Sequence, residues 1–556
     1  MSVIFLLYSC LAGAQIIESS KDIVFSFSEP FDGMSTYMGY PLGYKASFVI
    51  NGEINSFQMI GGSYKFLKYS GSTLNETQKN EVPKDEAVDI EGVERLGERF
   101  YYFYSKWDRP KKSEQLFVRE IDFEKGGFAG QERKLYASSG KLHPVDIYKA
   151  MMMAYPKFQR IKSIDENTLM VAYTWQLKKK VRKTTEQQIG MHVYDEKMNE
   201  QWHRVVKIPH ISNDVAIMDY AVSKDNDAYI LVQIFGDKSE ERKDKTGSYL
   251  IVYCVNGKTG NVTGTDISMD AVFVVEAGLS ENPNGQIVAY GMYGKSKSRL
   301  AHGVFATTLK DNGELIKIQK NDIPISIITQ NTKATRKARI ERTAMTSDWG
   351  LNNLALKNVI FGIDGSVSLI AEELSVGNST DWSYGINHGP IGGYKVSSSE
   401  KSKIKYGDVL IAHIAPDSAQ TRFSSIPKKQ MASVRGEVDR NQLKRTTFME
   451  LGFAFINKQS SPYVIFIDNI KNFNLPDDEI PHEHRSGLGG FLTGYKINPK
   501  TGEMENIVFF DLKDAQGRIL KQFSVSQVFQ LSEDEIAIEF ASEVPKKNVM
   551  VKIKLP

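Results

Sequence analysis

A short unit of two apolar strands joined by a polar turn recurs along the whole chain, and this repeat limits the possible folds more than any other feature. In each copy an apolar strand ends in a turn of Asp, Asn, Ser or Gly, and a second strand with alternating apolar residues follows. The clearest copies lie at residues 163–173, 222–234, 279–293, 361–373, 455–468 and 530–541. Because these turn residues accept positive φ or hydrogen-bond to their own backbone, each copy predicts a β-hairpin.

A second hairpin follows the first in most copies, as at residues 249–268, 303–324 and 490–511, where Lys-Thr-Gly and Asn-Gly mark tight turns. Two linked hairpins make a four-stranded antiparallel meander. Such units are predicted near residues 44–83, 91–136, 158–208, 216–267, 271–322, 354–428 and 447–512. The last segment, 523–555, holds only three strands, and residues 23–28 are suited to supply the fourth. Pairing of the two chain ends would leave no exposed sheet edge.

With this repeat the chain resembles the β-propeller superfamily, and residues 495–503 (YKINPKTGE) are similar to the turn between outer strands in many bacterial propeller repeats. The regular Trp-Asp of WD40 blades, the double glycine of kelch blades and the repeated Trp of quinone-dependent dehydrogenases are missing. The resemblance implies an all-β fold, a single propeller of seven or eight four-stranded antiparallel blades. It implies no particular activity, because propellers include hydrolases, lyases and pure binding platforms.

The N-terminal residues predict an extracytoplasmic protein, either periplasmic, outer-membrane-associated or secreted. Residues 3–7 are apolar, and Ala12, Gly13 and Ala14 are the small residues of a signal-peptidase site. Residues 1–14 are therefore predicted to be a signal peptide, and residues 15–556 a single propeller domain. Alternatively, residues 7–10 resemble a bacterial lipobox, which would place a lipid anchor on Cys10. No segment has the length and apolarity of a transmembrane helix.

The other cysteine, Cys254, lies in the apolar run 250–255 and is predicted to be a buried strand thiol. If Cys10 leaves with the signal, no intramolecular disulfide remains. A secreted chain of this size without disulfides is more typical of bacteria than of animals.

The predicted insertions are concentrated in one class of connection. In a propeller blade, strands a to d run from the channel to the rim, and the b–c loops and d-to-a connections lie on the same face. The long insertions are predicted there, at 323–352, 374–406, 429–446 and 469–490, together with shorter ones at 108–112, 137–157, 177–188, 209–215, 237–247 and 294–300. These ten segments hold 34 Lys and Arg against 18 Asp and Glu, although the whole chain carries a net charge of only +3.

A face of one sign attracts partners of the other sign, so this face predicts a site for a partner protein or an anionic glycan. The small net charge does not indicate a nucleic-acid-binding protein. The candidate ligand-binding residues are basic and aromatic side chains of two insertions: Arg336, Lys337, Arg339, Arg342, Trp349, Trp382, Tyr384 and His388. Loops on a rigid scaffold often carry binding residues, and Trp, Tyr and Arg are common interface anchors. The alternative interpretation is an ordinary solvated surface.

Motifs for covalent chemistry are missing from the sequence, which contains neither Gly-x-Ser-x-Gly nor His-Glu-x-x-His. No catalytic residue or cofactor is therefore predicted. Asp348 and Asp381, each followed by Trp, are the carboxylates that a glycosidase-like site would use. Asp478, His482 and His484 are weak metal candidates, since zinc ligands usually occur at fixed spacing. The sequence favours a binding platform, with a carbohydrate-active hydrolase or lyase and a structural subunit of a bacterial envelope complex as alternatives.

Overall fold

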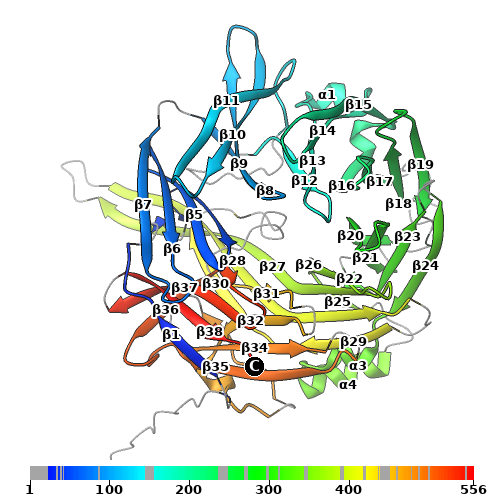
Figure 1. Ribbon diagram of the computed structural model, residues 1–556. Helices are drawn as coiled ribbons and strands as arrows, with labels where there is room; N and C mark the ends of the chain where they lie inside the picture. The colour runs from blue at the N-terminus through cyan, green and yellow to red at the C-terminus, as the bar shows by residue number, and fades with distance from the viewer. Residues whose placement is uncertain are drawn as a thin grey trace, which may run out of the picture.

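The computed structural model is a ring of eight antiparallel sheets that forms a β-propeller (Figure 1). It describes residue 20 and residues 23–556 except 33–35, 38–39, 42, 85–87, 144–155, 236–247, 268, 270–272, 296–299, 311–313, 344–348, 388–392, 417–420, 436–437, 439–450, 459–460, 477–478, 486–488, 499–500 and 545–546. The predicted all-β fold and four-stranded repeat are confirmed, and the number of blades is eight.

The first four blades follow one another along the chain, and in each the strands pair in chain order. Blade 1 contains β4 (Tyr44–Ile50), β5 (Glu53–Ile60), β6 (Ser63–Tyr69) and β7 (Glu76–Pro83). Blade 2 contains β8 (Asp89–Leu96), β9 (Arg99–Asp108), β10 (Ser113–Asp122) and β11 (Gly127–Ala137). Blade 3 contains β12 (Gln159–Lys162), β13 (Thr168–Tyr173), β14 (Glu186–Asp195) and β15 (Glu200–Ile211). Blade 4 contains β16 (Val215–Val222), β17 (Ala228–Phe235), β18 (Ser248–Val255) and β19 (Val262–Ile267).

The next three blades continue the pattern, with additions around blade 6. Blade 5 contains β20 (Phe273–Glu281), β21 (Ile287–Gly294), β23 (Gly303–Leu309) and β24 (Leu315–Asp322). Blade 6 contains β26 (Leu354–Phe361), β27 (Val367–Asn387), β28 (Gly393–Ile414) and β29 (Thr421–Ile426), and β28 also pairs with β30 (Gln430–Arg435). Blade 7 contains β31 (Ala454–Ile456), β32 (Tyr463–Asp468), β34 (Phe491–Ile497) and β35 (Met504–Asp511).

Blade 8 is built from both ends of the chain, as predicted. The strands β36 (Ile519–Gln530), β37 (Glu535–Val544) and β38 (Asn548–Lys554) come from the C-terminal segment, and β1 (Val24–Phe27) pairs antiparallel with β38. Phe25 of β1 packs against Phe510 of blade 7, with ring centroids 4.7 Å apart. The N-terminal strand therefore completes the ring.

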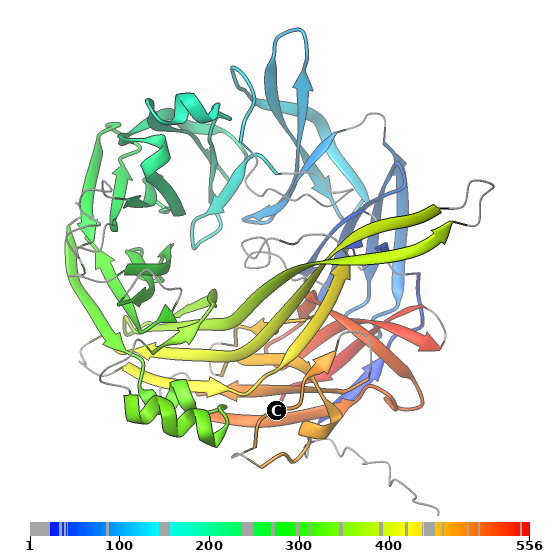
Figure 2. The ribbon, with the colours of Figure 1, turned by 180° about the vertical axis from the view of Figure 1, so that it is seen from behind.

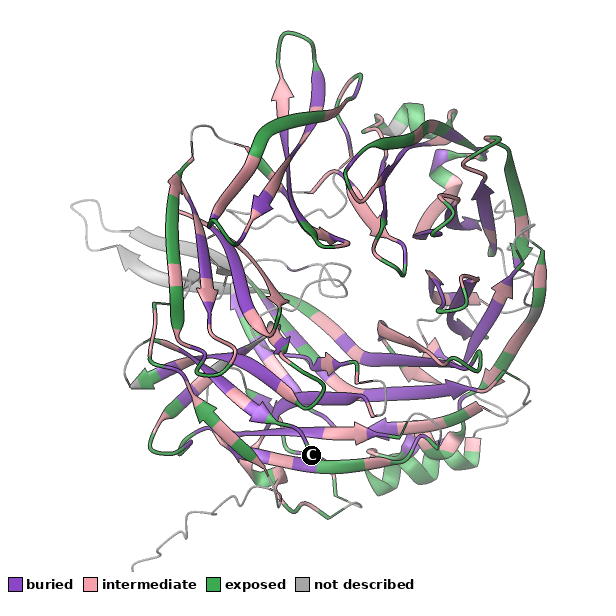
Figure 3. Cartoon of the chain, in the orientation of Figure 1, coloured by how far each residue is buried: buried purple, intermediate pink, exposed green. Residues whose placement is uncertain are grey.

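The hydrophobic core is divided into sectors that lie between the blades. A separate apolar cluster occupies each of the eight interfaces between neighbours, including the one between blades 8 and 1. Second strands such as β13 and β21 are buried along their full length, because both of their faces meet a neighbouring blade, whereas the outermost strand β7 is mostly exposed (Figure 3). Because both faces are buried, the second strands appear in the sequence as continuous apolar runs.

The remaining elements lie in the connections. They are α1 (Lys179–Arg182), η1 (Ser212–Asp214), α3 (Ile325–Thr329), α4 (Ala334–Thr343), η2 (Ile470–Asn472), and the short strands β2 (Thr36–Tyr37), β3 (Tyr40–Pro41), β22 (Leu300–Ala301), β25 (Leu351–Asn352) and β33 (His484–Arg485). No helix among the described residues has the length and apolarity needed to cross a bilayer. As predicted, Cys254 is a buried thiol in a strand, and it is free of any disulfide. Burial raises its pKa to about 11.

One predicted loop is a strand pair. Residues 374–406 were expected to form a long b–c loop, but β27 and β28 continue through most of this segment as one hairpin, paired from Leu374↔Tyr406 to Asn387↔Gly393. Figure 2 shows this hairpin projecting beyond the ring. Lys401, Lys403 and Lys405 are exposed and alternate with buried Ser402, Ile404 and Tyr406, which is the two-residue period of a strand.

Candidate functional site

Three of the four long insertions meet beside blades 6 and 7. The segment 429–446 contributes β30, which pairs in parallel with β33 of the segment 469–490 through Gln430↔His484. The segment 323–352 is attached to blade 6, because the side-chain amide of Asn331 donates to the carboxylate of Asp408 in β28 at 2.7 Å. Insertions that lie far apart in the sequence therefore form one continuous structure.

A pocket of about 410 Å³ opens in the insertion of blade 7. Its polar lining holds three cations, on Lys471, Arg485 and Lys513, against the single carboxylate of Glu483. The three cationic side chains are exposed. Asn469, Ile470, His482, His484 and Gly490 complete the wall. An excess of cations around a concave site favours an anionic ligand.

The loop around this pocket is held by two asparagines. The side chain of Asn469 accepts a hydrogen bond from the Lys471 backbone at 3.0 Å and donates to the Glu483 carbonyl at 2.7 Å. Asn472 exchanges two hydrogen bonds with the backbone of His482 and donates to Asp468 at 2.7 Å. Lys471 and Arg485 therefore project from a cross-braced loop, whereas Lys513 reaches the pocket from the segment that follows β35.

A buried ionic centre lies beneath the loop. Lys428 Nζ is 2.7 Å from the Glu372 carboxylate, and both side chains are at most 1% exposed. The same ammonium donates to Gln430 at 3.2 Å, and the Gln430 amide in turn donates to the Ile467 carbonyl at 2.8 Å. Since a buried charge is tolerated only when it is paired, this centre ties the 428–430 segment to blades 6 and 7.

Burial shifts the ionisation of the groups around Lys428. Burial raises the pKa of Asp468 to about 6 and that of Glu373 to about 7, and the nearby Asp408 adds to the effect on Glu373. Burial also lowers the pKa of His484 to about 4, and the charge of Lys428 acts in the same direction. His484 is therefore neutral at pH 7 and offers the pocket a hydrogen-bonding ring, while the positive charge comes from Lys471, Arg485 and Lys513.

Helix α4 carries the predicted basic cluster. Arg336, Lys337, Arg339 and Arg342 are all exposed, and Ile340 is the only buried residue that the helix contributes. Trp349 lies beside this helix: its indole N–H donates to the Thr343 hydroxyl at 2.8 Å, and the guanidinium of Arg339 lies 5.9 Å from its ring centroid. The structure thus brings Trp349 and the basic helix together.

Two of the other predicted ligand residues lie elsewhere in the fold. Trp382 and Tyr384 belong to the far part of β27, whose hairpin ends on the opposite side of the ring from α4 in both views (Figures 1 and 2). His388 and Asp348 are outside the described residues, and the side chains of Trp382, Tyr384 and Asp381 are not described. The predicted pair of glycosidase carboxylates is therefore not placed.

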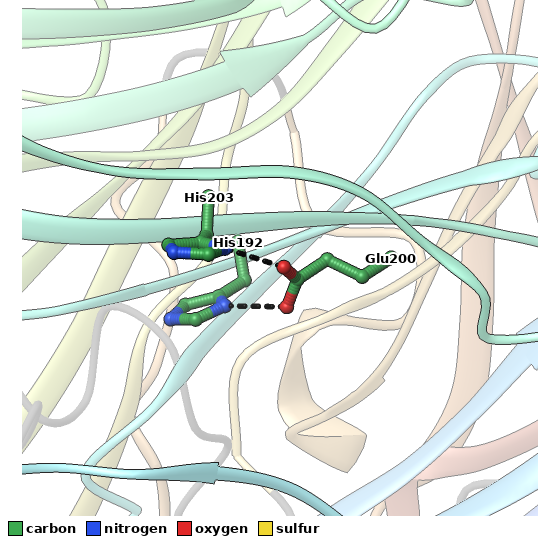
Figure 4. A group of neighbouring side chains, drawn as sticks. All are labelled: His192, Glu200 and His203. Atoms are coloured by element: carbon green, nitrogen blue, oxygen red, sulfur yellow. Dashed lines mark hydrogen bonds and ion pairs between the residues drawn. The ribbon is translucent and has the colours of Figure 1, made fainter.

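The predicted metal candidates are only partly placed: His482 and His484 line the same pocket. His482 is exposed, His484 is buried, and Asp478 lies outside the described residues. Within the described part of the chain, one group of three potential ligands does lie together, on blade 3: His192, Glu200 and His203, whose ligand atoms are all within 4.8 Å of one another (Figure 4). The sequence analysis did not identify this group.

No protein-family model matches the sequence, and no curated protein resembles it significantly. Among solved structures, the polysaccharide lyase Uly1 superposes with a TM-score of 0.35 and 8% identity, over 86% of this chain and 93% of the lyase. A post-proline cleaving enzyme from Rickettsia typhi gives 0.35 and 11%, over 90% and 58% of the two chains. The β-propeller domain of the Trilobed protease from Pyrococcus furiosus gives 0.29 and 8%, over 72% and 97%.

Proposed function

We propose that the protein is an extracytoplasmic binding platform that holds an anionic ligand, an acidic glycan or an acidic surface of a partner protein, on the insertions of blades 6 and 7. The observation that supports this most directly is the pocket in which Lys471, Arg485 and Lys513 stand against the single carboxylate of Glu483. The exposed cations of α4, with Trp349 beside them, form a second basic surface in the neighbouring insertion.

The two surfaces suit an extended ligand better than a small one. An anionic polymer or an acidic protein surface can contact several cationic groups at once, and each exposed contact alone contributes little free energy. An aromatic ring such as that of Trp349 can add apolar contact with a sugar face or a side chain. We therefore assign the insertions a binding role and no catalytic step.

The proposal is tested by measuring binding of the purified protein to arrays of acidic and neutral glycans at low and high salt. Acidic glycans should bind, and the affinity should fall by about tenfold or more as salt screens the cations. Two variants distinguish the surfaces: K471S/R485S/K513S removes the pocket charges, and R336S/K337S/R339S/R342S removes those of α4. The exposed control K111S/K112S, on blade 2, should bind like the unchanged protein.

If no glycan binds at either salt concentration, the glycan form of the proposal is wrong, and pull-down from an envelope fraction with the same variants tests the acidic-protein form. Binding that survives high salt and both sets of substitutions would contradict the basic surfaces as the ligand site. The extracytoplasmic location is tested separately, by fractionation and by mass spectrometry of the mature N-terminus, which distinguishes cleavage after Ala14 from lipid attachment at Cys10.

A further inference from the structure

The group on blade 3 consists of two imidazoles that face one carboxylate. Nδ1 of His192 lies 3.0 Å from one oxygen of Glu200, and Nδ1 of His203 lies 2.5 Å from the other (Figure 4). The two rings are stacked, with centroids 5.2 Å apart and planes at 20°. The Nδ1 atoms and the carboxylate thus converge on one small volume.

A β-bulge makes this convergence possible. His192 and His203 are direct partners across β14 and β15, but the register shifts before Tyr194, which pairs with Glu200. In a regular strand, residues 200 and 203 would point to opposite faces, since side chains alternate with a period of two. The extra residue in β15 turns Glu200 to the face that carries both histidines. Bulges commonly re-aim a side chain next to a functional site.

His192, the buried histidine of the two, is held from behind by residues that are not among the three. Tyr173 Oη lies 3.4 Å from Nε2 of His192, and the ring of Tyr136 from blade 2 packs against the same imidazole at 4.5 Å. Tyr173 reaches this position because its cross-strand neighbour is Gly190: a Cβ there would lie 2.1 Å from the tyrosine ring. A hydroxyl on the far nitrogen holds the ring orientation and leaves Nδ1 as the ligand atom.

Burial and hydrogen bonding both act on the ionisation of His192 and Glu200. Burial lowers the pKa of His192, although the hydrogen bond to Glu200 acts in the opposite direction. Burial works against ionisation of Glu200, but the hydrogen bonds to the two histidines outweigh it and lower the pKa of the carboxylate. Neutral imidazole and ionised carboxylate are the forms that bind metal ions.

We propose that His192, Glu200 and His203 form a binding site for a divalent transition-metal ion of the Zn²⁺ type, with the fourth position open to solvent. Two imidazoles and one carboxylate with one open position are a common ligand set for Zn²⁺. Ligand atoms around a tetrahedral zinc are separated by about 3.3 Å, so the contacts in this group require only small side-chain shifts. The side chains of Glu200 and His203 are 34% and 66% exposed, which gives the ion a path from solvent.

The site lies away from the insertions of blades 6 and 7, and it does not depend on the proposed anionic ligand. An ion here would join the two outer strands of blade 3 at their bulge. The turn between these strands is already attached to blade 2, because the guanidinium of Arg133 donates to the carbonyls of Lys197 and Met198 at 3.2 and 2.7 Å.

The experiment is a calorimetric titration of Zn²⁺ into the full chain, purified without a histidine tag and stripped with a chelator. One equivalent should bind. E200Q and H203A should each weaken binding at least tenfold while keeping the thermal unfolding midpoint of the metal-free protein, because both side chains are partly exposed. H482A is the matched control, since His482 is an exposed histidine in the competing loop, and it should bind like the unchanged protein.

Two further measurements make the test specific. Co²⁺ bound at the site should give the visible absorption of a tetrahedral ion, and this spectrum should be lost in H203A. Y173F should keep the stoichiometry and weaken binding by about tenfold, as expected for an outer-shell partner. The proposal is overturned if no equivalent of Zn²⁺ binds, if E200Q and H203A bind unchanged, or if H482A alone abolishes binding.

Discussion

Lys428 and Glu372 form an ion pair with an Nζ–Oε1 distance of 2.7 Å inside blade 6, where neither side chain is more than 1% exposed. Lys428 lies in the segment between β29, the last strand of blade 6, and the insertion strand β30, whereas Glu372 lies in the long strand β27. The pair therefore joins the blade to the insertions that carry the proposed binding surface.

We expect K428M to destabilise the protein by about 3–5 kcal/mol, because it leaves the Glu372 charge buried without its closest partner. Urea unfolding measures the change. The double variant K428M/E372L should recover much of the loss, since it removes both charges. K310M is the matched control: Lys310 pairs with Glu314 at 3.2 Å on the surface, and its loss should cost less than about 1 kcal/mol. Equal effects of K428M and K310M would contradict the buried pair.

Glu91 predicts a pH dependence of stability. It is buried in β8, where it accepts hydrogen bonds from Ser105 and from the backbone of Lys157 and Phe158. Burial raises its pKa to about 7 despite these bonds. The folded state therefore binds a proton that the unfolded state releases near pH 4.5. The contribution of protonated Glu91 to the free energy of unfolding is fully present below pH 4.5 and is lost as the pH rises through 7.

Stability of the unchanged protein relative to E91Q should consequently fall between pH 5 and pH 8, by up to about 3 kcal/mol. Thermal or urea unfolding of both proteins across this range measures the difference. E98Q alters an exposed carboxylate whose side chain is 90% exposed, and its curve should run parallel to that of the unchanged protein. A parallel curve for E91Q would show that Glu91 titrates normally in the fold.

Ring closure predicts a disulfide that joins the two chain ends. Val24 and Lys554 are cross-strand partners in β1 and β38, so V24C/K554C should form a disulfide under oxidising conditions and raise the unfolding midpoint by several degrees. The gain should disappear on reduction. V24C/I553C is the control, because the next residue along β38 points to the other face. Cross-linking only in the control pair would contradict the register.

Gly190 predicts a local steric effect. G190A places a Cβ against the Tyr173 ring, so we expect a loss of about 1–3 kcal/mol as the ring is displaced. G377A provides a comparison in strand β27, where nothing lies within 4 Å of the added Cβ, and it should be neutral or slightly stabilising. Differential scanning calorimetry distinguishes the two. Equal stabilities would mean that Tyr173 has another position available.

The hairpins, the four-stranded unit and the closing strand were predictable because each has a local signal. The hairpins have polar turns, the strands have apolar runs, and the C-terminal segment has three strands where the N-terminal segment has one to spare. The long hairpin of β27 and β28 was missed because its segment is rich in Gly, Ser and Asn, which usually indicate loops. The alternation from Lys401 to Tyr406 was a signal for it. Instead, residues 374–406 were predicted to be a loop.

The sites were less predictable for a different reason. Glu200 and His203 come together with His192 only through a bulge, and a one-residue shift in pairing leaves no mark in a single sequence. Likewise, the burial of Lys428 depends on Glu372, which is 56 positions earlier. The predicted charges of α4 were visible because they lie between residues 336 and 342, whereas Lys471, Arg485 and Lys513 are assembled from three separated positions.

The pairing of β1 with β38 also has a consequence for biosynthesis. Residue 24 leaves the ribosome more than 500 positions before residue 554, its partner, so seven blades can form while the first strand waits without a sheet. The eighth blade, and with it the last of the inter-blade cores, can be completed only after translation reaches the C-terminal strand. Such a distant contact makes ring closure a late folding event, and a prematurely terminated chain would keep an open edge next to blade 7 that invites association with other chains.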